Sequence, residues 1–164
     1  MKLEDIIYIW DAHQNNPKEP KDAVRFFDMK TPYSIHPLWC ATSIAAETAL
    51  NKKTREEGTL TLLYHDVLED TNKKLPDWLN KRIKYLINEM VFYGGIEQEN
   101  KEIWNKPREI RLYKLYDKVN NLMMGNWMNI KKRKCYEEYT KKLLNDVLKN
   151  YGELNITKIA KSLL

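Results

Sequence analysis

Four ionisable side chains follow an apolar run in the stretch LTLLYHDVLEDT, residues 60–71. Five of its first six residues suit a buried helix, yet His65, Asp66, Glu69 and Asp70 come within two turns. Such polar groups are costly to bury unless they have partners. Residues 65 and 69, like residues 66 and 70, are four apart and would share a face of a continuous helix. The stretch therefore predicts either a polar strip that binds a ligand or a helix end with solvated acids.

Two further residues favour the ligand-binding interpretation. His36 lies in YSIHPLWCATSIAAETAL, which is otherwise apolar and helical in pattern. A single histidine of this kind is more often a core residue, but His65 with its following aspartate is a second one. Asp117 lies in LYKLYDKVNNLMM, flanked at helical spacing by four residues expected to face a core: Leu112, Leu115, Leu122 and Met123. An unpaired carboxylate there would be expensive, so a cation is expected nearby.

Two imidazoles and two carboxylates from three predicted helices form a mixed nitrogen and oxygen ligand set. Such a set suits a divalent first-row ion such as Mn²⁺, Fe²⁺ or Co²⁺. An ion of this kind lowers the pKa of bound water and so generates hydroxide for attack on phosphorus. The sequence contains neither a GxxxxGK[ST] nor a GxGxxG loop, and no Ser or Cys stands in a recognisable nucleophile signature. We therefore expect water to be the attacking group.

The composition is that of a soluble chain with room for one domain. Its 164 residues can bury a continuous core but leave no space for a second catalytic domain. The net charge of +5 could indicate a polyanionic partner, but the basic residues are mixed with 23 acids and only KKRK, residues 131–134, clusters. Such a cluster is more often a solvated helix start than a nucleic-acid patch. We therefore expect a small-molecule partner and do not expect nucleic acid to be one.

Neither a membrane span nor a cysteine framework is expected. No apolar run approaches the roughly 18 residues of a spanning helix, and the N-terminal segment lacks a small-residue cleavage site. Cys40 and Cys135 lie far apart without a CxxC motif, which argues against disulfides and zinc fingers. We expect a cytoplasmic protein, and the sequence does not determine its oligomeric state.

The sequence predicts an all-α fold, a bundle of about eight or nine helices. Stretches rich in Leu, Lys, Glu and Ile dominate, with only five Gly and six Pro. The expected helices span residues 3–13, 20–27, 34–50, 54–70, 76–92, 97–104, 107–125, 131–150 and 154–163. Longer loops are expected around 14–19 and 27–33, where periodicity is lost.

Prolines and glycines give the expected helix boundaries. Pro20, Pro76 and Pro107 are expected near helix starts, where a missing N–H does no harm. The glycines of YGG at 93–95 and of YG at 151–152 are expected to end helices.

The order His36, then the doublet His65-Asp66, then Asp117 resembles the H…HD…D pattern of the HD-domain metal-dependent phosphohydrolases. The segments TPYSIHP, LLYHDVLEDT and KLYDKVNNL look like the hydrolase domain of the RelA/SpoT proteins and their small stand-alone relatives. Those proteins remove pyrophosphate from the ribose 3′ position of (p)ppGpp. The resemblance covers about residues 8–125 and implies one HD-type phosphohydrolase domain over residues 1–164.

The resemblance implies a role for each residue of the polar cluster. The two histidines of the pattern and its two aspartates match metal ligands that hold Mn²⁺ in that family. Glu69 and Asp70 match an acidic pair placed to orient and deprotonate the attacking water.

The resemblance also implies substrate contacts. Asn121 matches a residue that contacts the nucleotide, and Arg25 falls seven residues before Pro32, where the family has a basic residue. Tyr136 matches a substrate-contacting aromatic on the next helix. Alternative roles are a surface charge for Arg25 and a core aromatic for Tyr136. Lys30 is a further cation expected near the phosphates.

The chain departs from the family pattern at two places. The loop RFFDMK ahead of TPY carries fewer charges than is usual, and position 120 is Asn where His or Tyr is familiar. The expected activity is 3′-pyrophosphohydrolysis of (p)ppGpp. The alternatives are an HD-type 5′-nucleotidase acting on nucleoside monophosphates and a non-catalytic nucleotide-sensing module.

Overall fold

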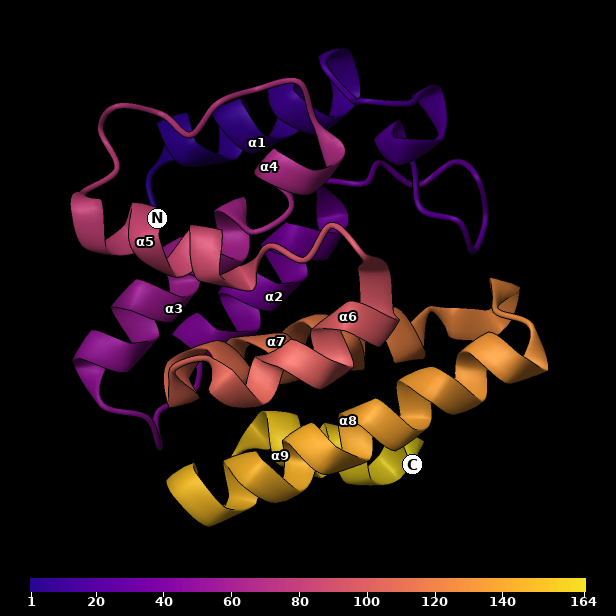
Figure 1. The fold of residues 1–164 in the computed structure, drawn as a ribbon. Coiled ribbons are helices and arrows are strands. Elements are labelled where there is room, and N and C mark those ends of the chain that lie inside the picture. The colour runs from indigo at the N-terminus through magenta and orange to yellow at the C-terminus, as the bar shows by residue number, and fades with distance from the viewer.

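The chain folds entirely into helices (Figure 1). The structure, a computed structural model, describes residues 1–164. It contains nine α-helices and three short 3₁₀ helices, with two isolated β-bridges and no strand. In chain order these are α1 (Leu3–Asn15), η1 (Pro20–Ala23), α2 (Ile35–Ala45), α3 (Lys52–Tyr64), α4 (Val67–Asp70), α5 (Lys81–Met90), α6 (Gly95–Glu102), η2 (Ile103–Asn105), α7 (Arg108–Met123), η3 (Gly125–Trp127), α8 (Ile130–Tyr151) and α9 (Asn155–Leu163). The expected all-α class is confirmed.

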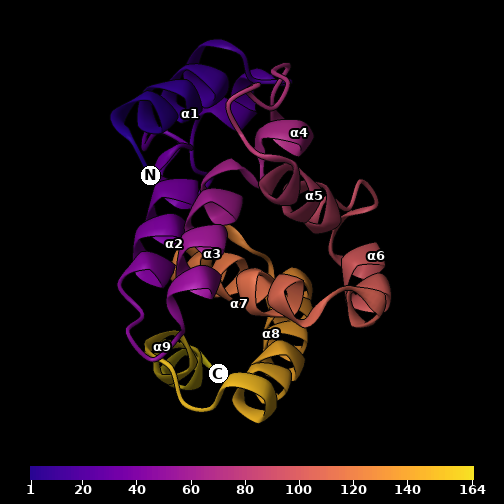
Figure 2. The same ribbon diagram turned by 90° about the vertical axis from the view of Figure 1, so that its left-hand side faces the viewer.

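Helix α7 is the central element. It packs against α2, α3, α5, α8 and α9, and Figure 2 shows it between the α2–α3 pair and the α8–α9 pair. Eleven of its 16 residues are buried, and four of these are polar or charged: Lys114, Asp117, Lys118 and Asn120. A helix that is buried on most sides is expected to be apolar throughout, so these four residues need partners from the surrounding helices.

Local sequence explains several helix boundaries. Asn51, Asn80 and Asn129 precede α3, α5 and α8, and each side chain accepts the backbone N–H three residues later. Such caps satisfy donors that a helix start leaves free. Gly152 ends α8 with a φ of 77°, which glycine adopts without steric cost. The expected end at 151–152 is therefore confirmed.

Other expected boundaries were wrong. The glycines at 94 and 95 begin α6 and do not end α5, which stops at Met90. Pro76 lies in a turn before α5, because the Asn80 cap starts that helix at residue 81. Met123, expected to face the core, is exposed at the end of α7.

Two expected helices are shorter or divided. The segment 20–27 is helical only over η1, and an irregular loop occupies residues 24–33. The segment 54–70 breaks after Tyr64 and resumes at Val67. None of the helices has the length and apolar character needed to cross a bilayer.

Candidate metal centre and active-site pocket

The break between α3 and α4 directs two neighbouring polar side chains into the interior. On a continuous helix, successive side chains point about 100° apart. Here the turn at residues 65 and 66 lets both His65 and Asp66 face inwards, with 2% and 7% of their surface exposed. Nε2 of His65 lies 3.1 Å from Oδ1 of Asp66. The four groups therefore do not lie on one continuous helix: His65 and Asp66 meet at a turn, and Glu69 and Asp70 line the adjoining pocket from α4.

Two more helices bring one group each to this pair. Nε2 of His36, on α2, lies 3.5 Å from Oδ2 of Asp66 and 3.4 Å from Oδ1 of Asp117 on α7. The same Asp117 oxygen lies 4.0 Å from Nε2 of His65. His36, His65 and Asp66 offer ligand atoms within 4.8 Å of one another. The structure thus brings together the four residues expected to be metal ligands: His36, His65, Asp66 and Asp117.

Hydrogen bonds orient both imidazoles towards the carboxylates. Nδ1 of His65 lies 2.7 Å from the carbonyl oxygen of Leu62, and Nδ1 of His36 lies 2.6 Å from Oδ1 of Asn120. Both partners are acceptors, so each Nδ1 carries the proton in the neutral ring. The Nε2 lone pairs of His36 and His65 therefore point into the cluster.

The cluster fits a cation. Burial lowers the pKa of His36, which favours its neutral form. A neutral Nε2 lone pair and a carboxylate oxygen repel at these separations unless positive charge lies between them. Nε2 of His65 is buried and has no hydrogen-bond partner. Two imidazole nitrogens and carboxylate oxygens are suitable ligands for a divalent first-row metal.

Two buried lysines neutralise Asp117 from the side away from the histidines. Nζ of Lys118 lies 3.1 Å and Nζ of Lys114 lies 3.5 Å from Oδ2 of Asp117. Burial opposes ionisation of Asp117, but these ammonium groups outweigh it and hold its pKa well below the ordinary range. Glu99 on α6 faces both lysines, at 3.3 Å from Lys114 and 2.9 Å from Lys118.

The cluster lies against a pocket of about 220 Å³. The pocket is lined by four groups of side chains: the carboxylates Asp22, Asp66, Glu69, Asp70, Glu99 and Asp117; the basic residues Arg25, Lys114, Lys118 and Lys132; the aromatic residues Phe26, Tyr33, Trp127 and Tyr136; and the amide of Asn121. Six carboxyl groups face four basic side chains, so the lining can complement a divalent cation when Glu69 and Asp70 are deprotonated.

Glu69 and Asp70 have strongly perturbed protonation. Burial, with a smaller contribution from Asp66, raises the pKa of Glu69 to about 7, against the opposing effect of Lys114. Burial and the charge of Asp66 raise the pKa of Asp70 to about 8. The backbone N–H of Phe92 donates to Oε1 of Glu69 and holds that carboxylate in place. Carboxyl groups in a pocket whose pKa values lie near neutral pH are candidates for proton transfer.

The residues expected to contact substrate lie in different environments. Tyr136 lines the pocket with its ring under Nζ of Lys118. Asn121 also lines it, but its Nδ2 donates to Asp117 across 2.6 Å. Arg25 is buried at the pocket wall and bonded to amide groups. Lys30 is exposed and is not among the pocket-lining residues.

Sequence reasoning missed several pocket residues. Tyr33, whose hydroxyl donates to Asp66, lies within the TPY segment but was not assigned a role. Lys114 and Lys118 stand one turn apart on either side of Asp117, and this spacing within an apolar helix was a usable signal. Phe26 and Trp127 pack together at 4.9 Å between ring centroids, and no sequence signal links them. Lys132, in the cluster expected to be a solvated helix start, is exposed, but it also lies over the ring of Trp127 and lines the pocket.

Comparison with known proteins finds similarity in three dimensions only. No protein-family model matches the sequence, and no curated protein matches it. Among solved structures, the chain is similar to a metazoan ortholog of SpoT that hydrolyses ppGpp and plays a role in starvation responses. The TM-score is 0.71 at 20% sequence identity, over 98% of this chain and 92% of that chain. The two proteins share an all-helical fold, and the expected likeness to the small stand-alone (p)ppGpp hydrolases is confirmed at the level of the fold.

Proposed function

We propose that the protein is a metal-dependent phosphohydrolase that acts on a nucleotide carrying phosphate or pyrophosphate on its ribose. The leading candidate reaction is 3′-pyrophosphohydrolysis of (p)ppGpp. The observation that carries the proposal is the convergence of His36, His65, Asp66 and Asp117 on a pocket that also contains Glu69 and Asp70. The fold shared with a ppGpp hydrolase supports it.

His36, His65, Asp66 and Asp117 would hold the divalent ion, which we expect to be Mn²⁺, with Fe²⁺ and Co²⁺ as alternatives. When bound, such an ion supplies positive charge that polarises a phosphoryl oxygen and acidifies water. The protein contributes the orientation of the ligands through the Nδ1 hydrogen bonds of His36 and His65.

Glu69 and Asp70 are proposed to move the proton. A base is most effective when its pKa lies near the working pH, and both carboxyl groups are raised to that region by burial and neighbouring acids. One of the two would take a proton from the attacking water. The proton would then be available for the ribose oxygen that departs from phosphorus.

The basic wall of the pocket is proposed to bind the phosphates. Lys114 and Lys118 are held at fixed positions by Glu99, and Lys132 lies at the ring of Trp127. Fixed cations bind phosphate without a large loss of side-chain entropy. Tyr136 and Asn121 line the same pocket and are proposed to contact the nucleoside, as the resemblance implies.

The test is incubation of Mn²⁺-loaded protein with ppGpp and with nucleoside 5′-monophosphates. We expect ppGpp and water to give GDP and pyrophosphate, with the 5′ diphosphate intact. In water enriched with ¹⁸O, attack on phosphorus places the label in pyrophosphate, whereas attack on carbon places it in the ribose hydroxyl of GDP. Release of phosphate only from 5′-monophosphates would indicate a nucleotidase. No turnover of any nucleotide, with retained nucleotide binding, would indicate a sensing module.

A further inference from the structure

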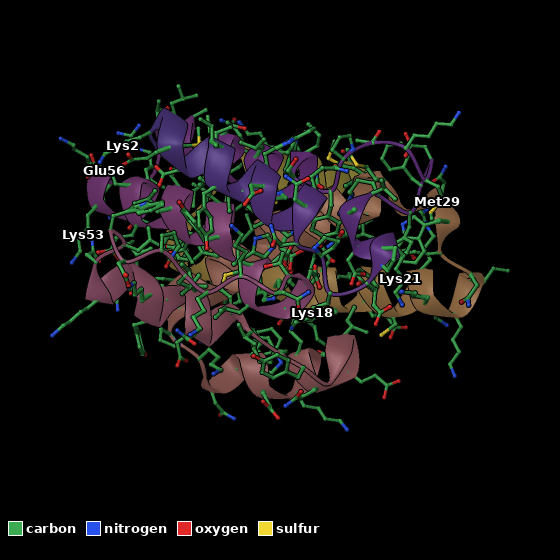
Figure 3. The ribbon with its side chains drawn as sticks, turned by 90° about the horizontal axis from the view of Figure 1, so that it is seen from above. Lys2, Lys18, Lys21, Met29, Lys53 and Glu56 are labelled. Carbon is green, nitrogen blue, oxygen red and sulfur yellow. The ribbon has the colours of Figure 1, made fainter.

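The loop between η1 and α2 places the side chains of Arg25 and Tyr33 beside the candidate metal centre. Both residues lie at the base of the loop, where backbone hydrogen bonds join its two ends. The backbone N–H of Arg25 donates to the carbonyl oxygen of Thr31 across 2.8 Å, and that of Tyr33 donates to Ala23 across 2.9 Å. The tip at Met29 lies at the outer edge of the molecule, at the same end as Lys21 (Figure 3). The base of the loop is therefore fixed, while the tip is exposed.

The guanidinium of Arg25 is buried among three polar or aromatic partners. Only 5% of its surface is exposed. Its Nη2 lies 3.1 Å from Oδ1 of Asn121 and 3.5 Å from Oδ1 of Asn120, and its Cζ lies 5.4 Å from the centre of the Tyr33 ring. A planar guanidinium can donate in two directions and still stack on an aromatic ring.

Two of these partners each hold a candidate metal ligand on α2 or α7. Oδ1 of Asn120 accepts from Nδ1 of His36 across 2.6 Å. Nδ2 of Asn121 donates to Oδ1 of Asp117 across 2.6 Å. Because each amide oxygen faces Arg25, the arginine sets which way both amides point.

The third partner holds a candidate ligand at the turn between α3 and α4. The hydroxyl of Tyr33 donates to Oδ2 of Asp66 across 2.9 Å. The Tyr33 ring is also stacked on His13, with centroids 4.8 Å apart. Arg25 and His13 together fix the ring, and the ring fixes the carboxylate.

We propose that Arg25 is a positioning residue for the metal centre, acting through Asn120, Asn121 and Tyr33 on three of its four ligands. This inference rests on the proposed function, because it requires that His36, Asp66 and Asp117 bind metal. It differs from the role that the resemblance implies for Arg25, which is direct contact with substrate. A buried guanidinium whose donors are directed at amides has less capacity to bind a phosphate.

The two roles predict different measurements. Loss of an outer group that orients metal ligands costs roughly 10–100-fold in metal affinity. Loss of a phosphate contact raises KM and leaves the affinity for metal unchanged. The decisive quantity is therefore the dissociation constant of Mn²⁺ in the absence of nucleotide.

The experiment is titration of metal-free protein with Mn²⁺, with free Mn²⁺ followed by electron paramagnetic resonance. We expect Arg25→Met to weaken binding by about 10–100-fold. Arg25→Lys should also weaken it, because a single ammonium cannot replace the planar fork. Lys21→Met removes an exposed cation from η1 and should bind Mn²⁺ as the parent protein does. Arg25→Met with an Mn²⁺ affinity within twofold of the parent would overturn the proposal.

Two further variants keep the test decisive if Arg25→Met does not fold. Tyr33→Phe keeps the ring and removes only the bond to Asp66, and Asn121→Ala removes the bond to Asp117. Both should weaken Mn²⁺ binding, and parent-like affinity in both would reject the proposal. In the double variant Arg25→Met/Asn121→Ala, the arginine substitution should lower the Mn²⁺ affinity by a smaller factor than it does alone. Asn121, through which Arg25 acts on Asp117, is already absent in that background.

Failure of the proposed function has a different signature. The parent and His65→Ala would then bind Mn²⁺ equally weakly, and no metal centre would exist for Arg25 to support. If instead the parent binds Mn²⁺ tightly, His65→Ala binds it weakly and Arg25→Met binds it as the parent does, only the role of Arg25 is rejected.

Discussion

Nζ of Lys118 lies 2.9 Å from Oε2 of Glu99, and both side chains are almost fully buried beside the candidate metal centre. Lys114 shares the same carboxylate, and the hydroxyl of Tyr139 donates to its other oxygen across 2.9 Å. Glu99 and Asp117 are thus the two carboxylate counter-charges that the two lysines share. This arrangement keeps two cations in the pocket wall that an apolar interior would otherwise exclude.

Glu99→Gln should destabilise the fold. The substitution leaves two buried ammonium groups with Asp117 as their remaining carboxylate partner, and breaking a buried ion pair costs about 3–5 kcal/mol. Urea unfolding of metal-free protein measures the loss. Glu97→Gln, at an exposed position of the same helix, is the matched control and should change the free energy of unfolding by less than about 0.5 kcal/mol. Equal unfolding midpoints for the two variants would contradict the importance of the buried cluster.

The purified protein should bind one divalent ion per chain. Elemental analysis gives the number of ions, and His65→Ala and Asp117→Ala should lose affinity by more than the roughly 10–100-fold cost of removing a supporting group. Asp77→Ala, which removes a fully exposed carboxylate, should retain the ion. Unchanged binding in either ligand variant would show that the ion, if present, lies elsewhere.

Removal of the ion should lower the melting temperature, because the ligands come from α2, the turn before α4, and α7. A ligand that binds only the folded state stabilises it by about 2.7 kcal/mol at a free concentration 100 times its Kd. Melts recorded with excess Mn²⁺ and with chelator measure this difference. The His65→Ala protein, which should not bind the ion, should show no response to chelator.

Glu69→Gln with Asp70→Asn should retain metal and lose turnover. Amides preserve size but cannot take a proton, and general base catalysis typically contributes on the order of 10²–10⁴-fold in rate. The measurements are kcat for ppGpp and the Mn²⁺ content of the same sample. Glu56→Gln, an exposed position on α3, is the control. Full activity in the double variant would mean that another group activates the water.

The contribution of Glu69 and Asp70 to the stability of metal-free protein should fall as pH rises from about 4 to about 8. The pKa values of Glu69 and Asp70 rise from ordinary values of 4.5 and 3.8 to about 7 and about 8 on folding. The folded state therefore binds more protons in this window, and deprotonation favours the unfolded chain. Comparing urea unfolding in the parent and in Glu69→Gln/Asp70→Asn isolates this contribution. An identical pH dependence in the two proteins would contradict the raised pKa values.

The sequence by itself determined the helical class and the residue types of the candidate site. Helical periodicity acts over a few residues, so most helices could be recognised without tertiary information. His36, His65 and Asp117 could be singled out because polar groups in apolar helices require partners. The sequence led us to expect that these residues lie close together. The packing of α2, α3 and α7 brings them there.

Tertiary structure decided how these groups are oriented. The break between Tyr64 and Val67 interrupts a pattern that is continuous in sequence, and His65 and Asp66 are buried at this break. Arg25 and Asn121 are 96 residues apart, and Lys114 and Glu99 are 15 apart on different helices. Contacts at such separations leave no periodic signal in the sequence, because the chain topology alone determines which side chains meet.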